Sequence, residues 1–335
     1  MERLGFIMNV KRWIAIIAVI VLLFVSVGFR FISSFTSMLL SNTFEVVDEV
    51  EEYIIEDGSS TEKIVVLNLE GVIQDLGGGG LFSAGYDHRE FLQKIEKAGE
   101  DPNVKGLILQ VDSPGGGVTE SAEIHKKLIE LQEEYDIPYY VSMGDMAASG
   151  GYYVAAPADK IFALPTTITG SIGVIMESMN FAGLAEDFGI TFNTIKSGKH
   201  KDIMSANREM TDEEKEILQD IVDEMYDEFV QIIVDGRGMD EAYVRDIADG
   251  RIYSGNQAVE NELVDEIGDL EEVIEAFKED YELDQAMVVE YGQYIGGFNM
   301  FVSKLDALLS GKEQDISNVI QLIRESDKSR AMYLY

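Results

Sequence analysis

The sequence predicts an α/β fold in which buried strands alternate with helices. Short runs rich in Val, Ile and Leu favour buried strands, and the segments between them carry apolar residues at helical spacing. This alternation is typical of crossover units that join neighbouring parallel strands. The expected strands are 63–73, 106–112, 138–143, 159–164 and 190–195, and the expected helices between them are 88–100, 119–135, 148–158 and 180–188.

The later part of the chain is expected to be mainly helical. Thr211 and Glu214 have the spacing of a capping box, in which each residue caps the other at a helix start. All five prolines lie between Pro102 and Pro165, so none interrupts the later segments. The helices expected here are 211–238, 241–248 and 269–280.

A membrane anchor is expected near the N-terminus. A weakly polar to apolar run over 13–29 is long enough to span a bilayer, and three basic residues precede it. The positive-inside rule then keeps the N-terminus in the cytoplasm and places the main domain outside it. A cleaved signal peptide is the alternative, because Ser26 and Gly28 are small. The expected organisation is a cytoplasmic N-terminus over 1–12, a transmembrane anchor over 13–30, an acidic linker over 31–62, a folded domain over 63–280 and a C-terminal extension over 281–335.

The composition excludes several classes of function. The chain carries 62 Asp and Glu against 26 Lys and Arg, a formal charge of −36, so its surface repels phosphate and no nucleic-acid partner is expected. It has no cysteine, which excludes disulfides, thiolate zinc sites and a cysteine nucleophile. Its three histidines predict no multi-histidine metal site, and we expect neither a metal nor a cofactor. The acidic surface is interpreted as strongly solvated or, alternatively, as attracting basic peptides.

The stretch "GDMAASGGYYVAA" (144–156) contains a candidate nucleophile, Ser149. A strand, a tight turn and a helix would expose the hydroxyl at a corner, and small neighbours would let a substrate backbone approach. Free backbone amides at the start of this helix would favour a developing oxyanion, and "DSPGGGV" (112–118) offers further amides at Gly115 and Gly116. The structural alternative is a cluster of small residues that only permits close helix packing.

The residues themselves leave the general base open. A lysine acts as a base only when it is neutral, so burial would have to lower its pKa from about 10.4. In an extended segment Lys199 and Lys201 would point to the same face, so alternation does not choose between them. The candidates are His88 and His125, both expected to be solvated, His200, and the lysines Lys196, Lys199 and Lys201.

Five motifs in a fixed order resemble the signal peptide peptidase A family of membrane-anchored serine proteases, which are related to the Clp protease subunit and crotonase folds. They are "DSPGGGV", "GDMAASGGYYVAA", "TGSIGVI", "SGKHKD" and "GRIYSGNQAVENELVDEIG". The resemblance runs from about Lys63 to about Phe277 and fits the short members with one catalytic domain. It implies a fold of repeated ββα units. The roles that it implies are Ser149 as nucleophile, Lys201 as general base, Ser171 as the residue that orients the base, and Gly115 or Gly116 with Gly150 as the oxyanion hole.

The resemblance also implies the reaction and the partners. It predicts a membrane endopeptidase that cleaves remnant signal peptides and other membrane-derived or unfolded peptides through an acyl-enzyme. It further predicts a ring-like homo-oligomer in which serine and lysine can come from neighbouring subunits. The alternatives are a non-catalytic membrane-anchored peptide-binding or stress-response scaffold, and an acyl-CoA enzyme. The tail "SDKSRAMYLY" (326–335) resembles a peptide substrate and is predicted to occupy the protein's own groove; a packed terminus is the alternative.

Overall fold

The computed structural model describes residues 50–75, 86–292 and 332–334, which belong to the compact unit Val50–Tyr335. The expected anchor at 13–30 and the linker up to residue 49 lie outside the described residues. Within the described ranges, no helix is both long and apolar enough to cross a membrane.

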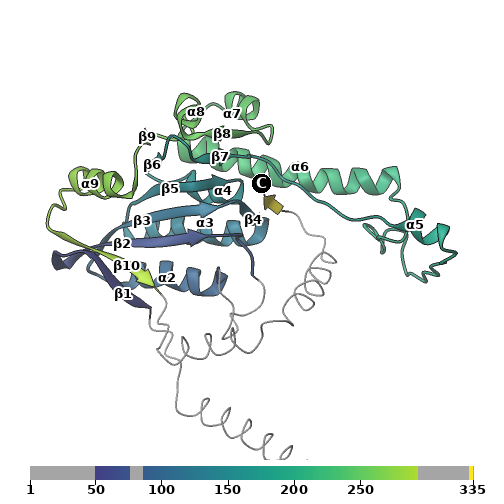
Figure 1. Ribbon diagram of the computed structural model, residues 1–335, viewed down its shortest axis with the longest axis horizontal. Coiled ribbons are helices and arrows are strands. Elements are labelled where there is room, and N and C mark those ends of the chain that lie inside the picture. The colour runs from purple at the N-terminus through teal and green to yellow at the C-terminus, as the bar shows by residue number, and fades with distance from the viewer. Residues whose placement is uncertain (1–49, 76–85, 293–331, 335) are drawn as a thin grey trace, which may run out of the picture. The chain divides into compact units, whose positions relative to one another are not determined.

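The core of this unit is a sheet that contains nine strands among the described residues (Figure 1). Its main order is β1-β10-β2-β3-β5-β6-β9, and β7, which pairs with β5, carries β8. The pairs from β10 to β9 along this order are parallel, as is β5 with β7, whereas β1–β10 and β7–β8 are antiparallel. The prediction of an α/β fold is thus confirmed. The strands are β1 Glu51–Glu56, β2 Ser59–Glu70, β3 Val104–Ser113, β5 Tyr139–Ala148, β6 Lys160–Ala163, β7 Ile168–Gly170, β8 Ile252–Ser254, β9 Glu266–Ile267 and β10 Ala286–Gly292.

Helices cover both faces of the sheet, and the strand residues alternate between them. In β2, Val65 and Leu67 pack into the larger core with α2, α3, α4 and α6, whereas Ile64 and Val66 pack against α9 on the other face. Successive side chains of a strand point to opposite faces, so the nearly continuous apolar run of β2 fits a strand that is buried on both faces. The helices are α2 His88–Glu100, α3 Val118–Tyr135, α4 Gly150–Ala155, α5 Ala182–Asp187, α6 Asp212–Arg237, α7 Glu241–Ile247, α8 Gly255–Glu260 and α9 Leu270–Asp280.

The sheet begins earlier than the sequence indicates. The sequence favours a linker up to residue 62, whereas the structure places β1 at Glu51–Glu56 and the start of β2 at Ser59. Acidic residues are poor strand formers, but β1 gains an antiparallel partner in β10 and lysine partners for its carboxylates. Lys63 Nζ lies 2.9 Å from Glu52, and Lys278 Nζ lies 2.5 Å from Glu56.

The prediction of a strand over 190–195 is wrong. The structure assigns no strand there, and Ile195 is fully exposed. An apolar and polar alternation forms a strand only where another strand can pair with it, and none in the described part of the chain does so. We call residues 176–211, which include α5, the arm. Figure 1 shows that α5 and the beginning of α6 project away from the sheet.

Candidate active site

Ser149 occupies a strained turn between β5 and α4. Its φ of 53° and ψ of −116° are unusual for a residue with a side chain, and such conformations cost of order 1–3 kcal/mol. The turn is held by hydrogen bonds that Ser149 N donates to Gly170 O (2.7 Å) and Tyr153 N donates to Ser149 O (2.8 Å).

The side chain of Ser149 does not cap α4. A serine at the N-cap of a helix ordinarily accepts a hydrogen bond from an amide of the first turn. Ser149 makes no such bond, and its buried Oγ has no hydrogen-bond partner among the described residues. A buried hydroxyl without a partner is costly, so this serine is poorly explained as a packing or capping residue.

Three glycines that the sequence singles out meet beside Ser149. A Cβ at Gly115 would lie 2.6 Å from Gly150 N, and a Cβ at Gly150 would lie 3.2 Å from Gly116 N. Gly115 also has a φ of +96°, which residues with a side chain rarely adopt. Its amide donates to Ser113 Oγ at 3.1 Å, so this amide already has an acceptor. The backbone of β4 (Gly115–Gly117) therefore lies directly against the start of α4.

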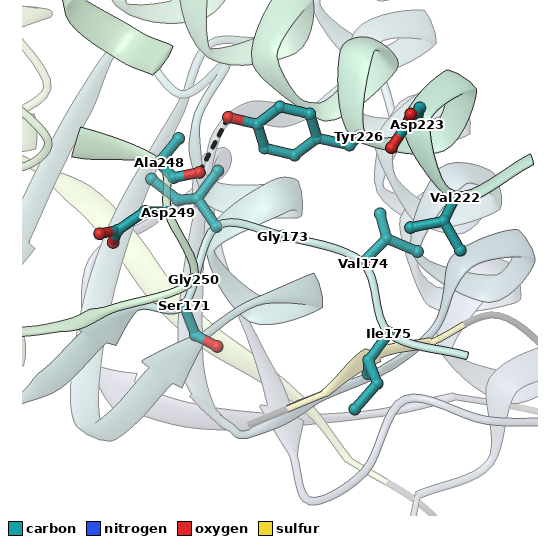
Figure 2. A pocket seen from close by; sticks show the side chains of 11 residues that line it. Ser171, Gly173, Val174, Ile175, Val222, Asp223, Tyr226, Ala248, Asp249 and Gly250 are labelled. Carbon is teal, nitrogen blue, oxygen red and sulfur yellow. Dashed lines mark hydrogen bonds between the residues drawn. The ribbon is translucent and has the colours of Figure 1, made fainter. Parts of the chain in front are cut away.

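Ser171 lies next to the Ser149 turn. β5 and β7 pair so that Ala148 is opposite Gly170, the residue before Ser171. Ser171 has a φ of 50° and donates its amide to Arg251 O at 2.8 Å. Figure 2 shows its hydroxyl pointing into an open pocket of about 490 Å³ that Val174, Ile175 and Tyr226 also line.

Lys201 lies on the arm and is not brought to Ser149 within one chain. Its side chain is exposed, and no hydrogen bond or ion pair of its Nζ occurs within the described ranges. The segment that joins α5 to α6 lies in the part of the chain that projects from the sheet, whereas α4 packs against the sheet (Figure 1). The backbone at Lys201 is not extended, because Lys201 N donates to Gly198 O (3.3 Å) and the chain turns there.

The other candidate bases have their own partners. Lys199 pairs with Glu213, and Lys196 pairs with Asp202 at 2.5 Å. His200 Nε2 lies 3.4 Å from Glu213 and its Nδ1 lies 3.7 Å from Glu214, both in the first turn of α6.

The prediction that His88 is solvated is wrong, and His125 is only partly exposed. His88 is buried at the start of α2, where its ring nitrogens lie 2.7 Å from Tyr86 Oη and 2.7 Å from Glu123 Oε2. Burial lowers the pKa of His125, whose ring lies 5.5 Å from the ring of Tyr153. None of the three histidines forms a hydrogen bond with Ser149 Oγ in the part of the chain that the structure describes.

The C-terminal tail lies along the glycine strand. Residues Met332–Leu334 form β11, which pairs antiparallel with β4 so that Tyr333 lies opposite Gly116. On its other edge, Met332 exchanges both backbone hydrogen bonds with Ile175, at 3.0 and 3.1 Å. The backbone N–H and C=O groups of successive residues point to opposite edges of a strand. Since those of Met332 point to Ile175, those of Tyr333 point to β4. The tail residues thus pair with the glycine strand of the candidate site. That this position is the substrate groove, and not the seat of a packed terminus, stays a prediction.

Tyr333 fills an aromatic pocket at this groove. Its side chain is fully buried between the rings of Tyr153 and Phe229, whose centroids lie 4.9 and 4.8 Å away. Its hydroxyl donates to Met225 O at 3.1 Å. The carbonyl oxygen of Tyr333 and the amide nitrogen of Gly150 lie on the same side of Gly115, close to the position that a Cβ would take there. The tail thus places one peptide carbonyl beside the candidate oxyanion donors.

The walls of this pocket are not predictable from the sequence motifs. Tyr153 lies four positions after Ser149 in the same motif, and this closeness in the sequence is the one signal that could have marked it as a site residue. Phe229 and Met225 come from α6, far along the chain, and no local pattern distinguishes them from other residues of an amphipathic helix.

Comparison with known proteins assigns the family. The family model for peptidase family S49 matches residues 132–284. A putative signal peptide peptidase SppA of Enterococcus faecium is 41% identical over 98% of this chain and 99% of its own length. The chain belongs to peptidase family S49. It is therefore a serine peptidase of the signal peptide peptidase type.

Other S49 relatives match a smaller share of the chain. A putative protease of Methanocaldococcus jannaschii is 42% identical over 62% of this chain and 66% of its own length. The chloroplastic serine protease SPPA of Arabidopsis thaliana is 33% identical over 57% of this chain and 28% of its own length. Both relatives are named as proteases, as expected of a shared S49 domain.

Proposed function

We propose that this S49 peptidase is a membrane-anchored serine endopeptidase that uses a Ser149–Lys201 dyad to cleave remnant signal peptides and other membrane-derived or unfolded peptides. The observation that carries the proposal is the tail strand β11, whose Tyr333 carbonyl lies beside Gly115 and Gly150 in the turn that also holds the buried, unpartnered Ser149 hydroxyl. An extended peptide on this strand would present one carbonyl to the nucleophile and to the backbone amides.

The reaction is an acyl transfer. Neutral Lys201 accepts the proton of Ser149 Oγ while this oxygen attacks the carbonyl carbon. The amides of Gly150 and Gly116 stabilise the oxyanion, and Gly115, whose amide is already donated to Ser113, provides the positive-φ turn. The lysinium then protonates the leaving amine, and water releases the acyl-enzyme. Ser171, next to Ser149, orients the lysine.

The proposed site is completed by a second copy of the chain. Lys201 lies on a projecting arm, and the pocket beside Ser171 is open. The arm exposes large apolar side chains, which soluble proteins usually cover with a partner. These side chains are Met179, Phe181, Leu184, Phe188, Ile190, Phe192 and Ile195. A ring-like homo-oligomer would cover them and would bring the Lys201 of one subunit to the Ser149 of the next.

The location and the domain organisation remain proposals of the same kind. We propose a single-pass membrane protein with its N-terminus (1–12) in the cytoplasm, an anchor at 13–30 and an extracytoplasmic protease domain that contains 63–280 together with the flanking sheet strands β1 and β10. We further propose that the sheet is of the Clp protease and crotonase type. The largely parallel pairing supports this assignment but is common to many α/β folds.

The tail is proposed to act as a built-in competitor of the substrate. Tyr333 and Met332 occupy the edge of β4, where an external peptide would have to pair. Because the Tyr333 carbonyl lies beside the donors, the Tyr333–Leu334 bond is the bond in register for cleavage.

The dyad is tested on the full chain in detergent, with apolar fluorogenic peptides as substrates. Ser149→Ala and Lys201→Ala should each lose at least about 1,000-fold in kcat/KM, because the nucleophile and the base act as one unit. Lys215→Ala, at an exposed lysine of α6 outside the site, is the matched control. Full activity of Lys201→Ala would move the base to Lys199 or His200, and inactivity of the wild type would favour the peptide-binding scaffold.

A further inference from the structure

The backbone around Lys201 has no regular secondary structure of its own. Between Phe188 and Thr211 the structure assigns no helix or strand, and the chain there is held by short turns such as Ile203 N to His200 O (3.1 Å) and Ser205 N to Asp202 O (3.1 Å). A general base must lie within hydrogen-bond reach of the proton that it accepts. A base on such a segment therefore needs side chains that fix the segment.

Arg208 ties this segment to α6. Its Nη2 donates to the carbonyl oxygen of Asp202 (3.0 Å) and to Asp202 Oδ1 (2.8 Å). The same guanidinium forms a two-pronged pair with Glu214, at 2.5 Å from Nη2 to Oε1 and 2.7 Å from Nη1 to Oε2. Asp202 directly follows Lys201, so one side chain joins the residue next to the base to the first turn of a long helix.

Glu214, the partner of Arg208 on α6, is itself held in place. The side chain of Glu214 is only 2% exposed and closes the capping box with Thr211 at the start of α6. Planar two-pronged pairs between arginine and a carboxylate fix orientation as well as distance. Lys196 Nζ holds Asp202 from the other side at 2.5 Å and also donates to Lys199 O at 2.8 Å.

Arg208 also balances negative charge near the base. The Arg208 guanidinium lowers the pKa of the Glu214 carboxyl to about 2, and hydrogen bonds from Arg208 and Lys196 hold the pKa of Asp202 below its usual range. Without Arg208, Asp202 keeps only Lys196 as a cationic partner and Glu214 loses its two-pronged pair, and the added negative charge near a lysine favours the charged lysine. Besides Lys201, the ionisable groups in and against this segment are Lys196, Lys199, His200, Asp202, Arg208, Glu209, Glu213 and Glu214.

We propose that Arg208 is a positioning residue for the base: it clamps the Lys201 turn to α6 and, with Lys196, balances the charge of the Asp202 carboxylate, which directly follows Lys201 in the chain. This role rests on the proposed Ser149–Lys201 dyad. Arg208 acts through Asp202 and Glu214 and does not contact the substrate.

The test compares pH–rate profiles of the full-length oligomer. In Arg208→Gln the rising limb of kcat should move up by about 0.5–1 pH unit, which lowers kcat about 3- to 10-fold on that limb, with little change in KM. Arg208→Lys keeps the charge but not the two-pronged geometry. The rising limb of its pH–rate profile should therefore stay near that of the wild type, while its kcat falls. Arg245→Gln removes a comparable arginine that pairs with Glu241 and Asp227 away from the arm, and it should leave the profile unchanged.

The charge role has a separate check. Adding Asp202→Asn to Arg208→Gln removes the carboxylate that Arg208 neutralises, so the limb should return toward that of the wild type. A profile of Arg208→Gln that superimposes on the wild type, or a uniform loss without movement of the limb, would overturn the proposal while Lys201→Ala still inactivates the enzyme. Full activity of Lys201→Ala would overturn the dyad, and the role of Arg208 with it.

Discussion

The rings of Tyr333 and Tyr153 stack with their centroids 4.9 Å apart, which joins the C-terminal tail to the helix that begins directly after Ser149. Phe229 packs against both rings, at 5.1 Å from Tyr153 and 4.8 Å from Tyr333. The tail residue thus occupies an aromatic pocket in the main core of the protein. Any external peptide that uses this pocket competes with the tail.

Removing the tail should raise activity. In a variant that ends at Arg330, kcat/KM for a short apolar peptide should increase about 3- to 10-fold, because the competing intramolecular strand is absent. Tyr333→Ala in the full chain should act in the same direction, since it loses the aromatic contacts but keeps the backbone. Tyr281→Ala, at the end of α9 on the other face of the sheet, is the control. Lower or unchanged activity of the shortened chain would argue that the tail is only a packed terminus.

Phe229 should determine which side chain the pocket accepts. Phe229→Leu enlarges the pocket, so kcat/KM for a peptide with tyrosine at this position should fall about tenfold relative to one with alanine. Phe277→Leu changes a phenylalanine that is equally buried in the core layer against α9 and should leave this ratio unchanged. The measurement is competition between the two peptides in one reaction. An equal loss for both peptides would point to general destabilisation.

Gly150 should tolerate no side chain. A Cβ there would lie 2.5 Å from Ser121 Oγ and 3.2 Å from Gly116 N, so Gly150→Ala would displace an oxyanion donor. We expect kcat to fall at least about 100-fold, as for loss of one such donor elsewhere. Gly144→Ala, in β5, where the atom nearest to a Cβ would be Asp112 Cβ at an ordinary 3.4 Å, should keep full activity. Retention of activity by Gly150→Ala would exclude its amide from the oxyanion hole.

Acid should weaken the attachment of the arm to α6. The pKa of Glu214 is about 2 in the folded protein, below the ordinary value of 4.5, so its pairing with Arg208 stabilises the fold fully above the ordinary value. This contribution is lost as the pH falls from about 4.5 toward 2, because the unfolded chain takes up the proton first.

Native-state proteolysis followed by mass spectrometry can locate this change. Cleavage within 196–209 should increase between pH 5 and pH 3 in the wild type, measured with an acid-stable protease and corrected for its own pH profile. Glu214→Gln should already be cleaved there at pH 5 and should change less with pH. Equal protection of the arm in both proteins at both pH values would contradict the role of this pair.

Much of the fold follows from local patterns, and the exceptions have physical causes. The strand at 63–73 and the helix after Thr211 are predictable because each has a continuous local signal, namely an apolar run and a capping box. β1 is missed because its partner β10 lies more than 200 residues away and stabilises an acidic strand with poor propensity. The segment 190–195 has the pattern of a strand, but none of the strands described pairs with it.

The site is predictable in its motifs and not in its assembly. Ser149 and its glycines lie in short motifs whose turns fold locally, and the structure brings them together through β4, β5 and α4. The pocket around Tyr333 joins α4, α6 and the tail, and no short-range pattern encodes such a meeting. The position of Lys201 on a projecting arm likewise depends on the tertiary structure.

The most direct test of the shared dyad mixes two inactive chains. Ser149→Ala and Lys201→Ala are co-expressed with different tags, and oligomers that contain both tags are isolated. If neighbouring subunits share the site, about a quarter of the interfaces in a random ring pair an intact Ser149 with an intact Lys201, and a matching share of wild-type activity should return. Mixed oligomers with no activity, although wild-type oligomers prepared in the same way are active, would contradict a dyad shared between subunits.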